Sequence, residues 1–461
     1  MNARQSDIGE HTLSAVDDIV WPALPGRDGA MLLSVLFQLE QSQWWPADKL
    51  RARQFGQIER LCQFARRNIP FLAARLDAAG IAADTPLGDE NWSRLPVLTR
   101  DELQQAGAKL QCSETPKGHG RTAQSTTTGS TGKPVSVRRT ELTNFYWTAF
   151  TLRDHMWRRR DLSATFATIR YDRSARAAYP QGILSDNWGS PGGLFRTGQA
   201  AKLTITTPVA DQAEWLARQN AAYLSTNPSN LGELLRHTEE SGMRFPTLKE
   251  VQTLSEVLDP ALREECRRLW NVEIADMYTT QETGYIALQC PETENYHIQG
   301  ETALVEILDG DGRPCRAGEI GRVVVTPLHN FATALLRYDI GDYAEVGAEC
   351  PCGRGLPVLT RIMGRARAML TLPDGGRSWP LMGGSRFAEI APVRQYQFVQ
   401  KSRERIEARL VVERPLQRRE EEKLRERMFS RLGHPFEIEF SYVERIARKA
   451  GEKYEEFKSE L

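Results

Sequence analysis

The stretch STTTGSTGKPVSV, Ser125 to Val137, gathers four threonines, three serines, two glycines and one lysine in thirteen residues. Hydroxyls, glycines and a lysine at this density are typical of a loop that binds phosphate. A Walker loop is excluded, because Gly129 and Gly132 are too close together and Pro134 follows Lys133. The residues after the loop alternate apolar and polar, which predicts a strand. We favour a polyphosphate loop that leads into a strand; a polar hairpin turn is the alternative.

Composition and charge narrow the class of protein. The 461 residues are too many for one ordinary domain, so we expect two or three. Basic and acidic residues both number 60, so no overall charge favours nucleic acid or an anionic membrane. No signal-peptide pattern and no apolar run of about 18 residues is present. Seven cysteines, an odd number, do not suggest a disulfide framework. We therefore expect a cytoplasmic protein with no nucleic-acid or membrane partner.

Hydrophobic periodicity predicts helices in the first third of the chain. Apolar residues recur at helical spacing from Leu33 to Leu76. Thr99 and Glu102 have the spacing of a capping box, which predicts a helix that begins after Thr99. Residues 141–157 read as a buried aromatic helix.

The rest of the chain predicts two domains. Short β-prone runs alternate with helices through the middle of the chain, which indicates an α/β domain. From about Ala303 strands predominate, and the end of the chain has the order β-β-α-β. We expect the α/β class, with a large N-terminal domain of several mixed sheets over residues 1–361 and a small C-terminal α+β domain over residues 362–461.

Two segments carry metal-ligating side chains. The stretch ALQCPETENYHIQ supplies Cys290 and His297, and GAECPCGRG supplies Cys350 and Cys352. Three thiols and one imidazole match a closed, tetrahedral structural zinc site. The alternative is a set of buried thiols, because the C-x-C spacing is shorter than the commoner C-x-x-C. We favour zinc.

Four further stretches give the phosphate loop a context. They are TLSEVL, ADMYTTQETGYIALQCPE, LLRYDIGDYAEV and RIMGRARAMLTLPDGGRSWP, which begin at Thr253, Ala275, Leu335 and Arg361. In this order and spacing, the five stretches resemble the adenylate-forming (acyl-activating) ligase superfamily. The resemblance is to the phenylacetate–CoA ligase branch, with its capsule-biosynthesis and coenzyme F390 synthetase relatives, and it covers roughly residues 40 to 461.

The resemblance implies a reaction in two steps that uses ATP, Mg²⁺ and a thiol. A carboxylate attacks the α-phosphate of ATP and releases pyrophosphate; a thiol, by default that of coenzyme A, then displaces AMP from the acyl-adenylate. It also implies that the small C-terminal domain is mobile. A carrier-protein thiol is another acceptor. Transfer of AMP to a cofactor hydroxyl, or a catalytically silent nucleotide-binding homologue, are the alternatives. A homodimer is compatible with the sequence.

The resemblance assigns site residues by position. Lys133 lies beside the phosphates and Glu282 holds Mg²⁺, which prefers few carboxylates together with phosphate oxygens. Asp342 accepts both ribose hydroxyls, as an ionised carboxylate is able to do. Arg365 reaches the phosphate or the ribose. The remaining nucleotide-binding residues are Ser125, Thr127, Thr128, Gly129, Ser130, Thr131, Gly132, Glu256, Tyr278, Thr279 and Gln281, of which Tyr278 is expected near the adenine.

This chain departs from the family pattern in two motifs. The second motif usually reads tyrosine, glycine, any residue, threonine, glutamate. Here Tyr278 to Glu282 reads Tyr-Thr-Thr-Gln-Glu. After Arg365 the usual acidic pair of the hinge is replaced by Ala-Arg-Ala.

The C-terminal tail offers a candidate catalytic lysine. Relatives end in a glycine-lysine motif whose lysine neutralises charge during adenylation. Lys453, two residues after Gly451, is the preferred candidate, with Lys449 and then Lys458 as alternatives. The choice rests on the expectation that Phe457 and its neighbour Tyr454 anchor a helix that follows the lysine.

The identity of the acid is left open by the sequence. The aromatic residues Phe145, Tyr146 and Trp147 are candidates for the acyl pocket, and a role in the core is the alternative. Aryl, fatty and amino acids all remain candidates for the small-molecule carboxylic acid.

Overall fold

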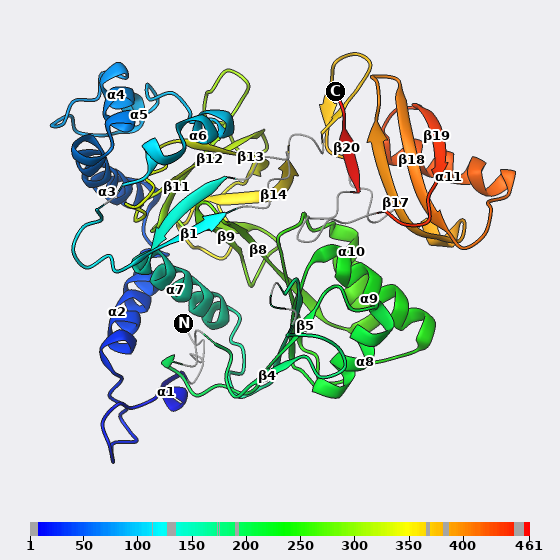
Figure 1. Ribbon diagram of the computed structural model, residues 1–461, viewed down its shortest axis with the longest axis horizontal. Helices are drawn as coiled ribbons and strands as arrows, with labels where there is room; N and C mark the ends of the chain where they lie inside the picture. The colour runs from blue at the N-terminus through cyan, green and yellow to red at the C-terminus, as the bar shows by residue number, and fades with distance from the viewer. Residues whose placement is uncertain are drawn as a thin grey trace.

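Figure 1 shows the computed structural model of the chain, which has a large N-terminal domain and a small C-terminal sheet domain. The structure describes residues 8–112, 114–126, 135–172, 174, 176–189, 193–365, 369–380, 387–446 and 456–461. The expected α/β class is confirmed.

A mixed sheet of 12 strands, in the order β11-β12-β13-β14-β10-β9-β8-β7-β6-β3-β5-β4, forms the centre of the N-terminal domain. Five neighbouring strands are parallel: β3 (Phe166–Arg170), β5 (Ala200–Thr204), β6 (Tyr223–Thr226), β7 (Glu250–Leu254) and β8 (Glu273–Thr280). The antiparallel strands are β4 (Ile183–Ser185), β9 (Gly284–Gln289), β10 (Tyr296–Ile298), β11 (Ala303–Leu308), β12 (Ile320–Pro327), β13 (Tyr338–Val346) and β14 (Val358–Arg365). Because the parallel strands end at one common edge, ligands are expected there.

Helices cover both faces of the parallel strands. One face packs against α8 (Val209–Gln219), α9 (Pro228–Ser241) and α10 (Pro260–Trp270), which lie together in green in Figure 1. The other face packs against α7 (Glu141–Trp157), which in turn packs against α2 (Arg27–Ser42). Ile169 of β3 belongs to the core on the α8–α10 side. Alternate residues of a strand point to opposite faces, so Thr168 and Arg170 point to the α7 side.

The first third of the chain packs on the antiparallel half of the sheet. A core of apolar side chains joins β11–β14 to the N-terminal helices α3 (Ala47–Asn68), α4 (Pro70–Ala78), α5 (Asp89–Trp92), α6 (Arg100–Ala106) and η1 (Gly107–Leu110). The short helix α1 (Ile8–His11) precedes them. The helical pattern expected from Leu33 to Leu76 is confirmed and is divided among α2, α3 and α4. The capping box is also confirmed, since Thr99 Oγ1 accepts from the Glu102 N–H at 3.2 Å.

The strand expected after the phosphate loop is confirmed. It is β2 (Ser136–Thr140), which pairs antiparallel with β1 (Thr122–Thr126), so the loop joins the two strands of a hairpin.

The C-terminal domain has the β-β-α-β order expected from the sequence. Its sheet has the order β19-β18-β17-β20, and α11 packs on it. The bounds are β17 (Val393–Gln400), β18 (Arg405–Val412), α11 (Arg418–Leu432), β19 (Glu437–Tyr442) and β20 (Phe457–Ser459). The shorter elements β15 (Leu370–Thr371), β16 (Arg377–Ser378) and η5 (Phe387–Glu389) precede them. The boundary between residues 361 and 362 stays a prediction; β14 crosses it and remains in the large sheet to Arg365.

Two expectations need correction. Phe457 does not begin a helix: it lies in β20, opposite Phe398 of β17, because its side chain fills the core beneath α11. The expectation of a buried aromatic helix holds only in part for α7: Phe150 and Trp157 are buried, whereas Phe145, Tyr146 and Trp147 are partly buried. Its last turns also bury charged residues, among them Arg153 and Asp154.

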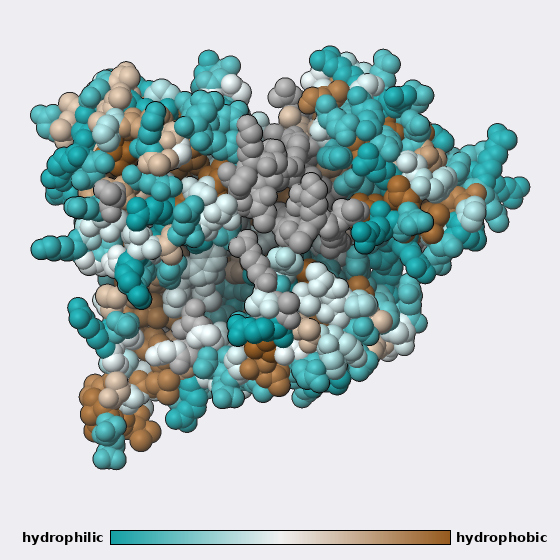
Figure 2. Space-filling view, in the orientation of Figure 1, coloured by the Kyte–Doolittle hydropathy of each residue, from teal (hydrophilic) through white to brown (hydrophobic). Residues whose placement is uncertain are grey.

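Two surface features complete the description. Figure 2 shows apolar side chains gathered at the N-terminal end of the molecule, where Val20 and Trp21 are 84% and 78% exposed. Among the described helices, none combines the length and the apolar character needed to cross a membrane.

Candidate active site

A cavity of about 1740 Å³ lies where the carboxyl ends of the parallel strands meet the C-terminal domain. From the sheet it is lined by Arg170 after β3, Asn227 after β6 and Ser255 after β7. From the C-terminal domain it is lined by Tyr396 and Phe457. Such an edge is where open α/β sheets bind ligands. The cavity is therefore the candidate site.

The end of β1 is tied to the second motif inside this cavity. Ser125 donates from Oγ to Gln281 Oε1 at 2.9 Å, and Arg139 Nη2 donates to Ser125 Oγ at 2.7 Å and to Gln281 Oε1 at 3.1 Å. The loop residues expected to hold phosphate, Thr127, Thr128, Gly129, Ser130, Thr131, Gly132 and Lys133, lie outside the described residues. The strands on either side of the loop, β1 and β2, nevertheless both contact Gln281, through Ser125 and Arg139.

Glu282 is buried and surrounded by guanidinium groups. Its Oε1 lies 3.5 Å from Nη1 of Arg100, at the start of α6. Arg139 and Arg365 also interact electrostatically with Glu282; burial lowers the pKa of Arg139 and Glu282 opposes that change. Arginines grouped in this way suit oxyanions such as phosphate, to which they donate paired hydrogen bonds. The role of Glu282 as a magnesium ligand stays a prediction, because it rests on the type of side chain alone.

Asp342, Tyr278 and Arg365 form one buried group. The Tyr278 hydroxyl donates to Asp342 Oδ2 at 2.9 Å, and Arg365 Nε lies 2.9 Å from Asp342 Oδ1. Burial, and then the neighbouring Asp342, raise the pKa of Tyr278 well above its usual value, so the phenol stays protonated. An ionised carboxylate has about four acceptor positions, so Asp342 retains capacity for ribose hydroxyls.

Two further expected residues line the same cavity. Glu256 accepts from Asn227 Nδ2 at 3.2 Å and from the Ser229 N–H at 3.0 Å. It therefore occupies the N-terminus of α9, where the helix dipole favours a carboxylate. Thr279 lies at the end of β8, opposite Tyr285 of β9.

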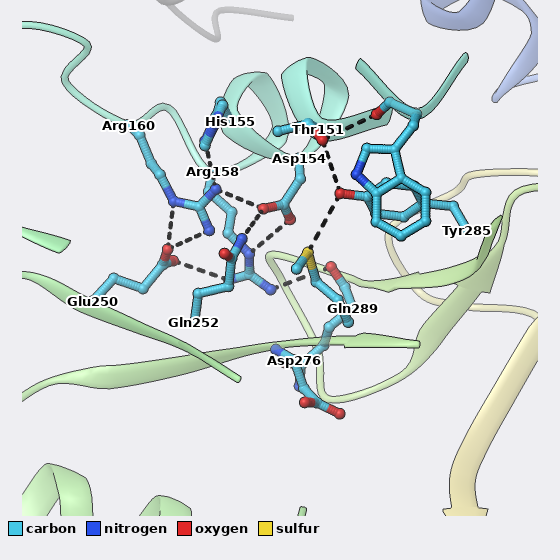
Figure 3. Close-up of polar contacts among 12 residues, drawn as sticks. Thr151, Asp154, His155, Arg158, Arg160, Glu250, Gln252, Asp276, Tyr285 and Gln289 are labelled. Atoms are coloured by element: carbon cyan, nitrogen blue, oxygen red, sulfur yellow. Dashed lines mark hydrogen bonds and ion pairs between the residues drawn. The ribbon is translucent and has the colours of Figure 1, made fainter. Parts of the chain in front are cut away.

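A buried polar network fixes the wall of the cavity, as Figure 3 shows. Asp154 of α7 binds Arg160 at 2.5 Å and accepts from Gln252 of β7 at 2.9 Å. Tyr285 shares a hydrogen bond of 3.0 Å with Thr151 of α7. These contacts join α7 to β7 and β9. They hold Tyr285 against Trp147, with 4.8 Å between the two ring centroids. Trp147 lines the cavity.

The four expected metal ligands come together at one point. The ligand atoms of Cys290, His297, Cys350 and Cys352 all lie within 4.8 Å of one another. Cys350 Sγ is 3.9 Å from Cys290 Sγ, and Cys352 Sγ is 3.2 Å from His297 Nε2. Zinc–sulfur bonds of about 2.3 Å in a tetrahedron separate the sulfurs by about 3.8 Å, so the cluster fits a zinc ion.

Neighbouring side chains support the thiolate form of this cluster. Thr293 Oγ1 lies 3.4 Å from Cys350 Sγ, and Asn295 Nδ2 donates to the same sulfur at 3.6 Å. Hydrogen bonds of this kind orient metal ligands in a second shell.

The structure places the other candidate residues as follows. Lys453, Lys449 and Gly451 lie outside the described residues. Lys458 lies in β20 with its Nζ 3.5 Å from Glu460. Sequence reasoning missed Arg100 and Arg170, which line the cavity, and Arg139, which donates to the lining residues Ser125 and Gln281. Single arginines near strand and helix ends form no motif that would have revealed them.

Comparisons with known proteins come from sequence and from structure. Residues 385–460 match the family model described as the CapK C-terminal domain. The chain is 26% identical over 347 residues to a phenylacetate-coenzyme A ligase of Thermus thermophilus, which covers 71% of this chain and 73% of that protein. It is 23% identical to the phenylacetate-coenzyme A ligase of Escherichia coli, with coverage of 70% and 73%. These similarities support the resemblance to the adenylate-forming ligase superfamily.

Solved structures agree on the fold of this adenylate-forming ligase homologue. A 2-hydroxyisobutyryl-CoA ligase, in its postadenylation state with an adenylate, superposes with a TM-score of 0.71. The match is 18% identical and covers 91% of this chain and 92% of that structure. The expected fold, with a large N-terminal domain and a small C-terminal sheet domain, is thereby confirmed.

Proposed function

We propose that this chain is an adenylate-forming acid–thiol ligase that activates a carboxylic acid as its acyl-adenylate and transfers the acyl group to coenzyme A. The observation that carries the proposal is the joint position of Ser125, Gln281, Glu282 and Asp342 around one cavity at the carboxyl edge of the sheet. Relatives that are named coenzyme A ligases support coenzyme A as the acceptor. A carrier-protein thiol is the other acceptor that the test below distinguishes.

The residues of this chain would divide the reaction between them. Asp342 would accept the ribose hydroxyls of ATP. Arg100, Arg139 and Lys133 would hold the charge that develops on pyrophosphate as it leaves, which is the largest electrostatic demand of the first step. Arg365 would reach the phosphate or the ribose. Glu282 would hold Mg²⁺, which neutralises phosphate charge when it is bound.

The remaining assignments complete the nucleotide site. Lys453 would neutralise charge between the acyl carboxylate and the α-phosphate, and Tyr278 would lie near the adenine. The other proposed nucleotide contacts are Ser125, Thr127, Thr128, Gly129, Ser130, Thr131, Gly132, Glu256, Thr279 and Gln281.

The test is exchange of labelled pyrophosphate into ATP that depends on an added carboxylic acid. We expect exchange with the wild type and a loss on the order of 10²–10³-fold in Glu282→Gln, because the lost charge acts on the transferring phosphate. The control is Glu273→Gln, which removes an exposed carboxylate paired with Arg267 and should leave exchange unchanged. Exchange that ignores the acid would contradict the proposal. AMP attached to a hydroxyl acceptor, without release of free AMP, would identify nucleotidyl transfer instead.

Lys453 separates the two half-reactions. Lys453→Ala should abolish pyrophosphate exchange and spare transfer from a pre-formed acyl-adenylate to coenzyme A, since the proposed charge is needed only in the first step. Lys449→Ala is the matched control. Equal loss of both half-reactions in Lys453→Ala, or loss of the first step only in Lys449→Ala, would reject the assignment.

We also propose that the cluster of Cys290, His297, Cys350 and Cys352 holds one structural zinc ion. Cys350→Ser should lower the zinc content and the melting temperature more than it lowers the rate of the folded enzyme, because a closed site contributes to folding. Cys315→Ser, outside the cluster, is the control. Metal analysis of purified protein that finds no zinc, together with unchanged melting of Cys350→Ser, would reject the site.

A further inference from the structure

Arg170 occupies an unusual position in the candidate cavity. It is the last residue of β3 and points to the α7 side of the sheet. Its Nη2 donates to Ser255 Oγ at 3.4 Å. Ser255 follows β7, which is two strands away from β3 across β6. The guanidinium therefore extends across the end of β6, over the edge of the sheet where ligands bind.

Three of the buried arginines elsewhere in the described chain have carboxylate partners, whereas a fourth, Arg263, donates to the backbone carbonyl of Ile274 at 2.8 Å. Arg153 lies 2.7 Å from Glu301, Arg160 lies 2.5 Å from Asp154, and Arg337 lies 2.9 Å from Glu306. Arg170 has none: over the described ranges, no aspartate or glutamate oxygen comes within 4.0 Å of its guanidinium. Its pKa is lowered by burial, with the Tyr285 phenol as the neighbour that opposes the change.

This arrangement leaves a guanidinium without its usual partner. An arginine has five N–H donors, and among the described residues Arg170 makes a single long hydrogen bond, to a neutral hydroxyl. Charges that are removed from water without a counter-charge are destabilising, so folded proteins pair them. A cation kept in this state at the edge of a ligand cavity is suited to an anion that arrives with the ligand.

Arg170 lies apart from the residues that are proposed to bind the phosphates of ATP. Arg100, Arg139 and Arg365 interact with Glu282, and these contacts form one connected set with Asp342. Arg170 contacts none of them; its neighbours are Ser255 and Tyr285. Tyr285 packs against Trp147, which lines the same cavity. Arg170 thus belongs to the part of the cavity that is bounded by α7 and the ends of β3 and β7.

We propose that the acid activated by this chain carries a second anionic group, as a dicarboxylic acid does, and that Arg170 pairs with this group while the other carboxylate is activated. The proposal rests on the proposed ligase function. The second group would accept paired hydrogen bonds from the guanidinium. Trp147 would contact the apolar part of the acid that joins its two ends.

The experiment compares matched pairs of acids in acid-dependent pyrophosphate exchange. Each pair is a dicarboxylic acid and its monoamide, in short aliphatic and aromatic series: glutaric and glutaramic acids, adipic and adipamic acids, phthalic and phthalamic acids. We expect the wild type to prefer the dicarboxylic member of the best pair by roughly 10²-fold or more in kcat/KM, because a site built for a polar group rejects an analogue that leaves it unpaired.

Variants then assign the preference to one side chain. In Arg170→Gln the preference should disappear, whereas the KM for ATP should stay unchanged. Arg170→Lys should retain part of the preference, because it keeps the charge and loses the paired geometry. Lys202→Gln is the control, since Lys202 is an exposed cation that lines the same cavity. Equal use of acids and monoamides by the wild type, or a loss in Arg170→Gln that is the same for every acid and for ATP binding, would overturn the proposal.

Binding of the acids to the protein distinguishes failure of the proposed ligase function from failure of the pairing with Arg170. If no acid supports exchange, the proposed function fails, and melting temperatures with the same dicarboxylic acids decide the role of Arg170. A rise in melting temperature with dicarboxylic acids that is lost in Arg170→Gln and kept in Lys202→Gln would support the pairing. No rise with any of these acids would overturn it.

Discussion

Two regions on the α7 side of the sheet treat buried charge in opposite ways. Beneath α7, Asp154 and Glu250 neutralise Arg158 and Arg160, and the network joins one helix to two strands. At the end of β3, Arg170 is left with a hydroxyl as its only hydrogen-bond partner in the described part of the chain. A closed network of this kind contributes to structure, whereas an open charge provides a place for a ligand. The contrast shows that the partners of an ionised residue distinguish the two roles better than its burial does.

Removal of Asp154 should have the largest effect, because it makes the closed network resemble the open one. Asp154→Ala would leave Arg158 and Arg160 with Glu250 alone, and we expect a loss of about 3–5 kcal/mol in the free energy of unfolding. Chemical denaturation measures the loss. The control is Glu214→Ala, which removes an exposed pair with Arg218 and should change stability by about 0.5 kcal/mol or less. A small effect of Asp154→Ala would show that the network is not the main attachment of α7.

A carboxylate partner for Arg170 should make the end of β3 resemble the closed network beneath α7. Ser255→Asp replaces the hydroxyl to which Arg170 now donates by a carboxylate. Aspartate tolerates the positive φ of 76° at this position. We expect a gain of roughly 1–2 kcal/mol in stability from the charged hydrogen bond, and a loss of activity with dicarboxylic acids. Melting temperature and pyrophosphate exchange report the two effects. Ser255→Asn, neutral and of the same shape, should give neither; an unstable Ser255→Asp would argue against an unpaired Arg170.

Glu456 gives a third, smaller test at the boundary between the domains. Burial, and then Asp259, raise the pKa of its carboxyl from 4.5 to about 7; Tyr396 donates to it at 3.1 Å and Glu256 adds further repulsion. A carboxyl whose pKa is raised on folding binds its proton more tightly in the folded state, so stability should fall as the pH rises from 4.5 to about 7. The effect should be modest, because a shift of the small domain would return Glu456 to water.

Calorimetry across this range of pH measures the slope. Glu456→Gln should flatten it and raise the melting temperature at neutral pH. The control is Glu460→Gln, because Lys401 and Lys458 pair with Glu460 in the same strand region. An unchanged slope in Glu456→Gln would mean that other groups cause the pH dependence.

Patterns that are local in the sequence predicted most of the fold. The capping box at Thr99, the strand after the phosphate loop and the last β-β-α-β unit all follow from side-chain periodicity over a few residues. The cluster was also anticipated, because two short segments each carry two metal-ligating side chains, Cys290 with His297 and Cys350 with Cys352.

What escaped prediction depends on contacts between distant segments. Arg170 and Ser255 are 85 residues apart and meet only because β6 lies between their strands. Residues 141–157 were read as a buried aromatic helix, and the buried charge of Asp154 was not anticipated, because its partner Gln252 lies far away in the sequence. Phe457 was assigned to a helix because its pairing partner, Phe398, lies far away in the sequence.

The register of β13 and β14 has a mechanical consequence. Asp342 and Arg365 are directly opposite each other in this pair of strands, and Arg365 is the last residue of the large sheet before the chain leaves for the small domain. The carboxylate proposed to hold the ribose is therefore the same group that fastens the exit of the chain. Ribose hydroxyls that donated to Asp342 would draw its negative charge away from Arg365 and weaken this ion pair. One ion pair would thus act as a latch whose strength depends on the occupancy of the site.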